Sequence, residues 1–327
     1  PEDLDVELQM LAAYVSDPGW RDTGWNRIRA LSGTIHNQLA STPSGVFGRD
    51  AGTLLYNGDR RWATPTEQEM AASSIADGRA LLAPVLASAP LEVVIVGDVD
   101  VEQAIRQVAA TFGALPARTA QPAPSETIRF PAGNAEPVRL IHRGRADQGL
   151  AYIGWPTIGF YDDPKLARTL TLLSAVYQLR LLQRIREEQG TTYSPQAAHS
   201  PSEAYPGYGT FMGRIEARPE ALDGFLRDAQ AIAQELSARP IDADELERAR
   251  RPLVEGVQRQ RNGNGWWLES LVGSQTDPRV AASIHSQLAD YAAITPADLQ
   301  AAARRFLVAD RAYKIEVVPA PAAPATP

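Results

Sequence analysis

The chain has 327 residues, of which 44% are hydrophobic and 22% charged, and its formal net charge at pH 7 is −7. This length is enough for about two domains with cores of their own, and the acidic balance argues against a nucleic-acid partner. The chain has no cysteine, which excludes disulfides and thiolate metal sites, and no apolar run reaches the ~20 residues that span a bilayer.

The N-terminal part of the chain is predicted to contain helices followed by a strand. Residues 1–20 have a helical apolar period after their opening Pro-Glu and Leu-Asp. In residues 64–84 a Thr can cap a helix, a Pro suits the first helical position, and an acid follows in the first turn. The apolar run LEVVIVGD at 91–98 predicts a strand, after which Asp100 can cap the next helix. Together these elements predict a first α/β domain over residues 1–114.

A linker follows this domain. The sequence after residue 114 is rich in Pro and Ala and has no periodicity, which is typical of an inter-domain linker, in this case over residues 115–126. A second, complete α/β domain is predicted over residues 127–318, and the Pro-rich residues 319–327 are predicted to be a frayed tail. The second domain has strand-like runs at 138–144, 149–156, 209–217 and 312–319, and a long helical pattern at 162–190.

The two parts repeat one order of helix, helix and strand. The matching segments are 1–20 with 219–240, 64–84 with 295–310, and 91–98 with 312–319. This repeat predicts an α+β fold of two related domains, each an antiparallel-rich sheet with helices packed on one face. Residues 127–218 have no counterpart before the first copy. The first domain is therefore expected to be truncated at its N-terminus, and the chain to be the later part of a longer protein.

The long helix of the second domain has signals at both ends. Asp162 or Asp163 can cap its start, Pro164 suits its first turn, and Gly190 suits its C-terminal stop. These signals predict a helix over 162–190.

Arg186 and Tyr193 lie at the C-terminal end of this helix. At about 100° per residue, Arg186 falls between Leu179 and Leu182 on the apolar arc, and Arg184 points roughly the other way. A charge on such an arc needs a partner or a water-filled cleft. The pattern alone favours a structural role, in which Arg186 caps helix carbonyls and Tyr193 fills the core.

Three segments carry a resemblance to a known family. RLLQRIREEQGTTYS (180–194) resembles the signature in the second domain of the pitrilysin/insulinase-type zinc metallopeptidases, which include processing-peptidase-like bacterial members. VIVGDVDVEQAIRQVAATFGALPAR (94–118) looks like the strand, turn, helix and linker that close the first domain in that family. NGNGWWLESLVGSQTDPR (262–279) is similar to the late helical region of its larger bacterial members. The resemblance runs over nearly the whole chain in the same order.

The resemblance implies four related α/β domains in two halves that close around an unfolded peptide. One half carries HxxEH and a later Glu, which bind zinc and activate water. This chain would be the C-terminal half, whose partners are the zinc-bearing N-terminal half and a peptide or unfolded polypeptide substrate. By position, Arg186 and Tyr193 correspond to the family's pair that meets the substrate opposite the zinc. A periplasmic location follows as a family expectation.

The chain itself has no zinc motif. His36, His142, His199 and His285 are widely separated, and none forms HxxEH or HExxH. We therefore expect no cofactor in this fragment, zinc bound in the parent by residues outside this chain, and no peptide hydrolysis by the fragment alone. Ser194 and His199 could be joined with an acid at the helix start into a triad, but their spacing matches no known signature.

Other candidate motifs have structural interpretations. Asp98 and Asp100 could bind a cation, but a turn with a helix cap explains them. Trp266 and Trp267 could bind peptide, although aromatic residues in a helical pattern are more often core. GYGTFMG (207–213) precedes a strand rather than a helix, so nucleotide binding is not expected.

Two alternative functions remain open at this stage. The first is a non-catalytic structural or peptide-binding subunit of the same family, which would bind a partner or peptide without chemistry. The second is an unrelated pair of α/β domains that resembles the family in pattern only.

Overall fold

The computed structural model describes residues 3–119, 127–189 and 194–321, apart from the side chains of residues 187–189. The chain forms two compact units, each made of three separate stretches of sequence. The first unit comprises residues 1–33, 65–125 and 259–284, and the second comprises residues 34–64, 126–258 and 285–327. The units are thus interleaved along the chain, and each has its own elements.

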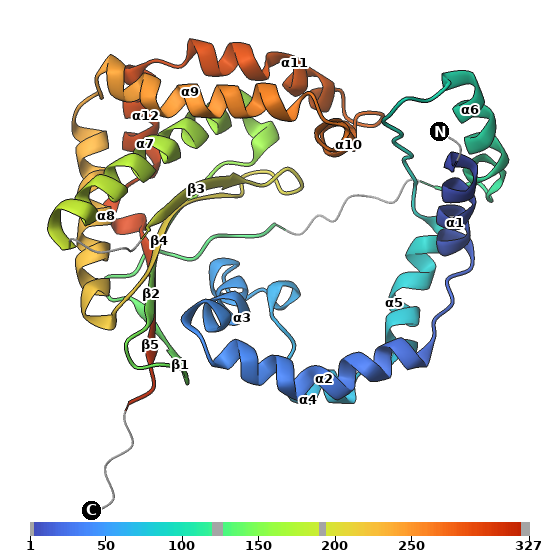
Figure 1. Cartoon of the computed structure of the whole chain (residues 1–327), viewed down its shortest axis with the longest axis horizontal. Coiled ribbons are helices and arrows are strands. Elements are labelled where there is room, and N and C mark those ends of the chain that lie inside the picture. Colours follow the sequence, from blue (N-terminus) through green and yellow to red (C-terminus); the bar gives the residue numbers. More distant parts are fainter. Residues whose placement is uncertain (1–2, 120–126, 190–193, 322–327) are drawn as a thin grey trace, which may run out of the picture. The chain divides into compact units, whose positions relative to one another are not determined.

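The second unit is built on a five-stranded mixed sheet with the strand order β1-β5-β2-β4-β3 (Figure 1). Only β1 and β5 pair in parallel, and the other neighbours are antiparallel. The strands are β1 (Val138–His142), β2 (Gly149–Thr157), β3 (Gln196–Pro201), β4 (Gly209–Ala217) and β5 (Tyr313–Pro319). The predicted α+β fold with an antiparallel-rich sheet is therefore confirmed.

The sequence pattern explains the position of each strand in the sheet. In β2, every residue except Pro156 is buried, which suits the central strand of a sheet covered on both faces. In β4, buried residues alternate with partly exposed ones, as expected from the two-residue period of a strand. Gly213 in β4 has no side chain, and a Cβ there would lie 3.1 Å from the ring of Tyr177, so the glycine allows a helix to pack closely.

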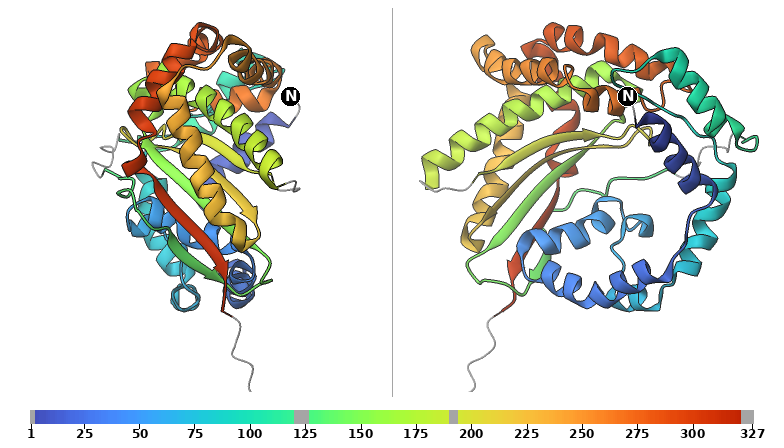
Figure 2. Two further views of the ribbon diagram at one scale, coloured as in Figure 1. Left: turned by 90° about the vertical axis from the view of Figure 1, so that its left-hand side faces the viewer. Right: turned by 45° about the vertical axis from the view of Figure 1, so that its right-hand side comes forward.

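One face of the sheet is covered by helices that share its main core. Trp155, Tyr177 and Phe211 pack edge to face, with ring centroids 5.3–6.2 Å apart, and join a helix to two strands. The indole Nε1 of Trp155 also donates a hydrogen bond to the carbonyl oxygen of Val308 at 3.1 Å. Figure 2 shows α8 lying across the sheet, which it contacts at β2 and β4. The helices of this unit's layer are α7 (Pro164–Gln189), α8 (Leu222–Ala238) and α12 (Pro296–Phe306). Helix α9 (Ala243–Gln260) belongs to it up to residue 258, and α11 (Pro278–Ala293) belongs to it from residue 285.

The opposite face of the sheet is also covered, by α3 (Pro43–Leu55). Val46 of α3 is fully buried and belongs to a second core with Leu150, Tyr152 and Ile315. This helix comes from the stretch before the predicted linker, so the sheet has a helical cover that the sequence pattern did not predict. The short η1 (Arg60–Trp62) follows α3 in the same stretch.

The first unit is helical. Its helices are α1 (Leu4–Ser16), α4 (Glu67–Ala72), α5 (Ile75–Ser88), α6 (Val101–Ala110) and α10 (Asn264–Leu271), and α2 (Asp22–Ala40) begins in it. The strand predicted over residues 91–98 is not formed, because no strand among the described residues of this unit pairs with it. The counterpart of β5 in the predicted repeat is therefore absent from the described part of the first unit.

The predicted cap of α12 is confirmed and that of α4 is shifted. Thr295 forms a capping box with Asp298, as predicted. In the first copy the cap is Thr66, which forms a capping box with Glu69, so the predicted cap Thr64 and first helical residue Pro65 lie before α4. Asp163, and not Asp162, caps α7 by accepting a hydrogen bond from the backbone N–H of Leu166 at 2.9 Å. The break between α4 and α5 is also a capping box, formed by Ser74 and Asp77, which the predicted single helix had missed.

Removing the indole of Trp155 tests the main core. Because Trp155 is fully buried, we expect Trp155→Ala to lower the free energy of unfolding by about 3–5 kcal/mol. Leu179→Ala is the control on the more exposed side of α7 and should cost about 1 kcal/mol or less. Urea titration followed by circular dichroism measures both, and equal effects would contradict the assigned core.

Candidate functional site

The last turns of α7 separate a buried side from an exposed side. Leu181 and Ile185 are fully buried in the main core. Arg186, one residue later, is exposed. Leu179, which was predicted to lie on a buried arc next to Arg186, is 38% exposed, so this part of the arc is open. Arg186 therefore keeps its charge in solvent and needs no buried partner.

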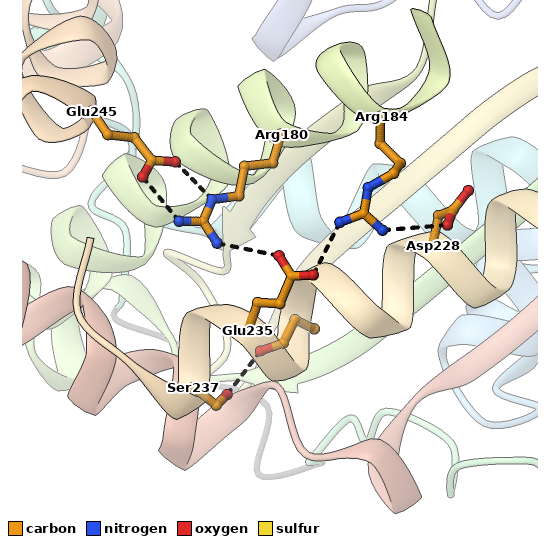
Figure 3. A network of polar contacts seen from close by, with 7 residues as sticks. Arg180, Arg184, Asp228, Glu235, Ser237 and Glu245 are labelled. Atoms are coloured by element: carbon orange, nitrogen blue, oxygen red, sulfur yellow. Dashed lines mark hydrogen bonds and ion pairs between the residues drawn. The ribbon is translucent and has the colours of Figure 1, made fainter. Parts of the chain in front are cut away.

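The two other arginines of this helix lie in a chain of alternating charges between α7, α8 and α9 (Figure 3). Arg180 donates to both carboxylate oxygens of Glu245, at 2.7 and 2.9 Å, and lies 3.6 Å from Glu235. Arg184 donates to Glu235 at 3.0 Å and lies 3.6 Å from Asp228. The hydrogen bond from Arg180 to Glu245 raises the pKa of Arg180 above its ordinary value. This network fixes the C-terminal half of α7 against both neighbouring helices.

Arg186 differs from these arginines. None of the ion pairs between described side chains involves Arg186, whereas Arg180 and Arg184 each contact two carboxylates. This agrees with the prediction that Arg184 and Arg186 point in different directions. Arg186 is thus exposed and lies outside the charge network of Arg180 and Arg184.

Gln178 anchors the chain on the other side of the candidate site. Its Nε2 donates to the carbonyl oxygen of Pro195 at 2.7 Å, and its Oε1 accepts from the backbone N–H of Ala197. Tyr193 lies outside the described residues, which end at residue 189 and resume at residue 194. The chain on both sides of this gap is held in place, by the packing of α7 and by the contacts of Gln178 with the start of β3. The sequence signal for this anchor is the polar residue Gln178 within the apolar run LLSAVYQLRLL, and the anchor was not predicted from it.

The possible triad around His199 is not formed. The imidazole is buried, its Nε2 lies 3.1 Å from the hydroxyl of Thr157, and its Nδ1 lies 3.1 Å from the hydroxyl of Thr171. Asp162 instead accepts hydrogen bonds from two backbone N–H groups, and Asp163 caps α7. Burial lowers the pKa of His199 to about 4, so this ring is neutral and structural at pH 7.

The described residues do not form a metal centre. They contain no group of three His, Asp or Glu side chains that could hold an ion. His142 is buried, and its ring nitrogens contact the backbone of Gly144 and Gln148 in the turn after β1. Asp100 caps α6 by accepting from the N–H of Gln103 at 2.7 Å. A zinc ion of the kind that the family resemblance implies therefore does not fit the donors that the described part of this chain supplies.

The other predicted features also have structural contacts. Trp267 donates to the carbonyl oxygen of Arg261 at 2.8 Å, and the Arg261 guanidinium lies 4.9 Å from the centre of the Trp266 ring. Among the described residues, no helix is long and apolar enough to cross a membrane.

The sequence matches the family model described as peptidase M16 inactive domain over residues 86–253. The match covers half of the chain, and the chain belongs to this family. A comparison with curated proteins finds no match.

Solved structures share the fold. A peptidase M16 inactive domain from Pseudomonas fluorescens is 21% identical, with a TM-score of 0.78 over 97% of this chain and 75% of that one. A protease from Helicobacter pylori is 14% identical, with a TM-score of 0.78 over 97% and 77%. The periplasmic protease PqqL from Escherichia coli is 18% identical, with a TM-score of 0.72 over 92% of this chain and 33% of that one. The chain thus spans about a third of PqqL and three quarters of the other two.

A double-mutant cycle measures the strength of the charge network. The Arg180 and Glu245 side chains are 21% and 14% exposed and form two hydrogen bonds, so we expect a coupling free energy of about 1–3 kcal/mol. The control pair is Arg248 and Asp244 of α9, whose side chains are 64% and 82% exposed. There we expect about 0.3–0.5 kcal/mol. Equal coupling of the two pairs would show that the network does not hold α7.

The pH dependence of stability tests the assignment of His199. Its pKa is about 4 in the folded chain, below the ordinary value of 6.5, so its contribution is complete above pH 6.5. As pH falls from 6.5 to 4, the unfolded chain takes up a proton that the folded chain excludes, and stability falls. His199→Gln should remove this component, whereas His285→Gln, on the exposed surface, should retain it. Unfolding titrations from pH 8 to 4 compare the three proteins, and an unchanged slope in His199→Gln would refute the assignment.

Proposed function

We propose that this chain is the non-zinc, C-terminal half of a zinc metalloendopeptidase of the pitrilysin/insulinase type. In this proposal it forms one wall of the chamber that holds a peptide or unfolded polypeptide. The observation that carries the proposal is membership of the peptidase M16 inactive-domain family over residues 86–253.

The proposed substrate contacts are Arg186 and Tyr193. Arg186 lies exposed at the end of α7, without an ion pair to a described side chain, and the network of Arg180 and Arg184 holds the helix behind it. A guanidinium has donors in a planar fork that can bind a peptide carbonyl oxygen. A phenol can donate a hydrogen bond to the oxyanion that forms when water attacks that carbonyl. In this role Arg186 orients the peptide and Tyr193 stabilises the charge that develops.

The chemistry of water activation belongs to the partner half. The zinc ion would be held there by residues outside this chain, and it would supply the activated water. The partners of this chain are then the zinc-bearing N-terminal half and the peptide. A periplasmic location for this chain agrees with that of the structural relative PqqL, a periplasmic protease from Escherichia coli.

Substitution of the pair in the complete peptidase tests this function. We expect Tyr193→Phe to lower kcat/KM for an unfolded peptide by about 100-fold, since one lost oxyanion donor costs about 3 kcal/mol. Arg186→Ala should lower kcat/KM by about the same factor, because the peptide carbonyl loses the group that orients it. Arg251→Ala, at an exposed arginine of α9, is the matched control and should retain wild-type activity. Rates are measured with a fluorogenic peptide, after circular dichroism has established that each variant is folded.

Two outcomes contradict the proposal in different ways. Wild-type activity in both variants would refute the role of the pair and leave the family assignment intact. A complete parent protein that binds no zinc and cleaves no peptide would favour the alternative, a structural or peptide-binding subunit.

A further inference from the structure

Strand β5 of the second unit carries a buried acidic side chain. Ile315 and Val317 belong to the core beneath α3, so Glu316 between them faces the opposite side of the sheet, where α8 lies. Glu316 is only 2% exposed. Glutamate is almost never fully buried unless it is paired, so the partners of this carboxyl decide its charge.

The ion pair of Glu316 leaves one of its oxygens unpaired. On β1, the register partner Arg139 lies 3.3 Å from Oε2, and the Arg139 side chain is 66% exposed. Among the described residues, no hydrogen-bond donor contacts the buried Oε1. On β2 the register partner is Ala151, which has no polar side chain. An ionised Glu316 would therefore keep a buried oxygen without a hydrogen bond, which costs free energy.

A second carboxyl faces that of Glu316. Asp223 lies in the first turn of α8, and its side chain is within hydrogen-bonding range of Glu316. Two carboxylates have no proton to donate to each other, whereas a carboxyl and a carboxylate can share one. Lys314, on the same face of β5, is directed elsewhere, since its Nζ donates to the carbonyl oxygen of Ala135 at 2.6 Å. A proton on Glu316 therefore supplies the hydrogen bond that the buried carboxyl lacks.

The surroundings of Glu316 favour this proton. Burial raises the pKa of Glu316 above its ordinary value, the facing Asp223 carboxyl raises the pKa further, and Arg139 opposes both with a smaller effect. Asp223 is exposed, so its charge stays in contact with water, whereas Glu316 is buried. Of the two carboxyls, Glu316 is therefore the one that holds the proton.

The contact between these carboxyls lies where α8 begins. The residue before the helix, Ala221, makes no side-chain cap. Leu222, the first residue of α8, is buried, and a Cβ on Gly149 of β2 would lie only 2.9 Å from its Cδ1, so the helix start packs closely on the sheet. The contact of Asp223 with Glu316 adds a polar link between this first turn and β5.

We propose that Glu316 and Asp223 form a pH-sensitive latch, in which one shared proton holds the first turn of α8 on β5. When the proton leaves at higher pH, the two carboxylates repel each other, and Glu316 keeps only its contact with Arg139. A carboxyl whose pKa is raised in the folded chain contributes stability that is complete below its ordinary value of 4.5 and is lost as pH rises through the folded pKa. This sign is opposite to that of His199, whose contribution is lost as pH falls.

Thermal unfolding as a function of pH tests the latch. The amide of Glu316→Gln can donate to Asp223 at every pH, so the latch stays closed in this variant. We expect the Tm of Glu316→Gln, relative to that of the wild-type chain, to rise by about 2 °C or more between pH 4.5 and pH 8. The His199 contribution is present in both proteins and cancels. Glu220→Gln, at an exposed position just before α8, is the control and should follow the wild type at each pH. A Tm difference between Glu316→Gln and wild type that does not change with pH would overturn the proposal.

Infrared spectroscopy gives a second, independent readout, because a protonated carboxyl and a carboxylate have different C=O bands. At pH values above the ordinary 4.5, the wild-type chain and Glu220→Gln should retain a protonated-carboxyl band that Glu316→Gln lacks. Asp223→Asn, at an exposed position, supplies an amide donor to Glu316 and should weaken this band and reduce the dependence of Tm on pH. No band that depends on Glu316 would overturn the proposal. Neither measurement involves peptide hydrolysis, so both outcomes are separate from those that test the proposed function.

Discussion

The packing of α7 against β2 and β4 is the interaction on which the second unit depends. Trp155, Tyr177 and Phe211 form three edge-to-face contacts that join one helix to two strands, and Gly213 leaves room for the Tyr177 ring. Because these side chains are fully buried, α7 has one position on the sheet. The inner side of α7, up to Ile185, is therefore fixed against the sheet.

Electrostatics and packing have separate roles in this helix. Leu181 and Ile185 fix its inner side, while Arg180 and Arg184 connect its outer side to α8 and α9 through carboxylates. An arginine that already binds two carboxylates has few donors left for a substrate. Arg186, two residues beyond Arg184, is exposed in the same turn and outside that network.

The sequence predicted the elements whose signals are local and left out those that depend on distant partners. The caps at Asp163 and Thr295 and the strands β1, β2, β4 and β5 followed from short patterns. The packing of α3 on the sheet could not be predicted, because the spacing of apolar residues shows that a helix has a buried face but not which surface it packs against. Residues 91–98 have the composition of a strand, but no described segment pairs with them. Composition alone cannot predict a strand, because a strand also needs a second segment to pair with. In the candidate site, Arg186 was selected through the family resemblance and stays a prediction, since the pattern alone favoured a structural role. The anchor at Gln178 could not be predicted because it depends on the positions of Pro195 and Ala197.

The central claim is that this chain is the half of an M16 peptidase that contributes no catalytic centre. The most direct measurement is hydrolysis of one unfolded, fluorogenic peptide by this chain and by the complete natural polypeptide, each with zinc supplied. We expect cleavage by the complete polypeptide that a chelator abolishes, and no cleavage by this chain. Zinc-dependent cleavage by this chain alone would contradict the claim.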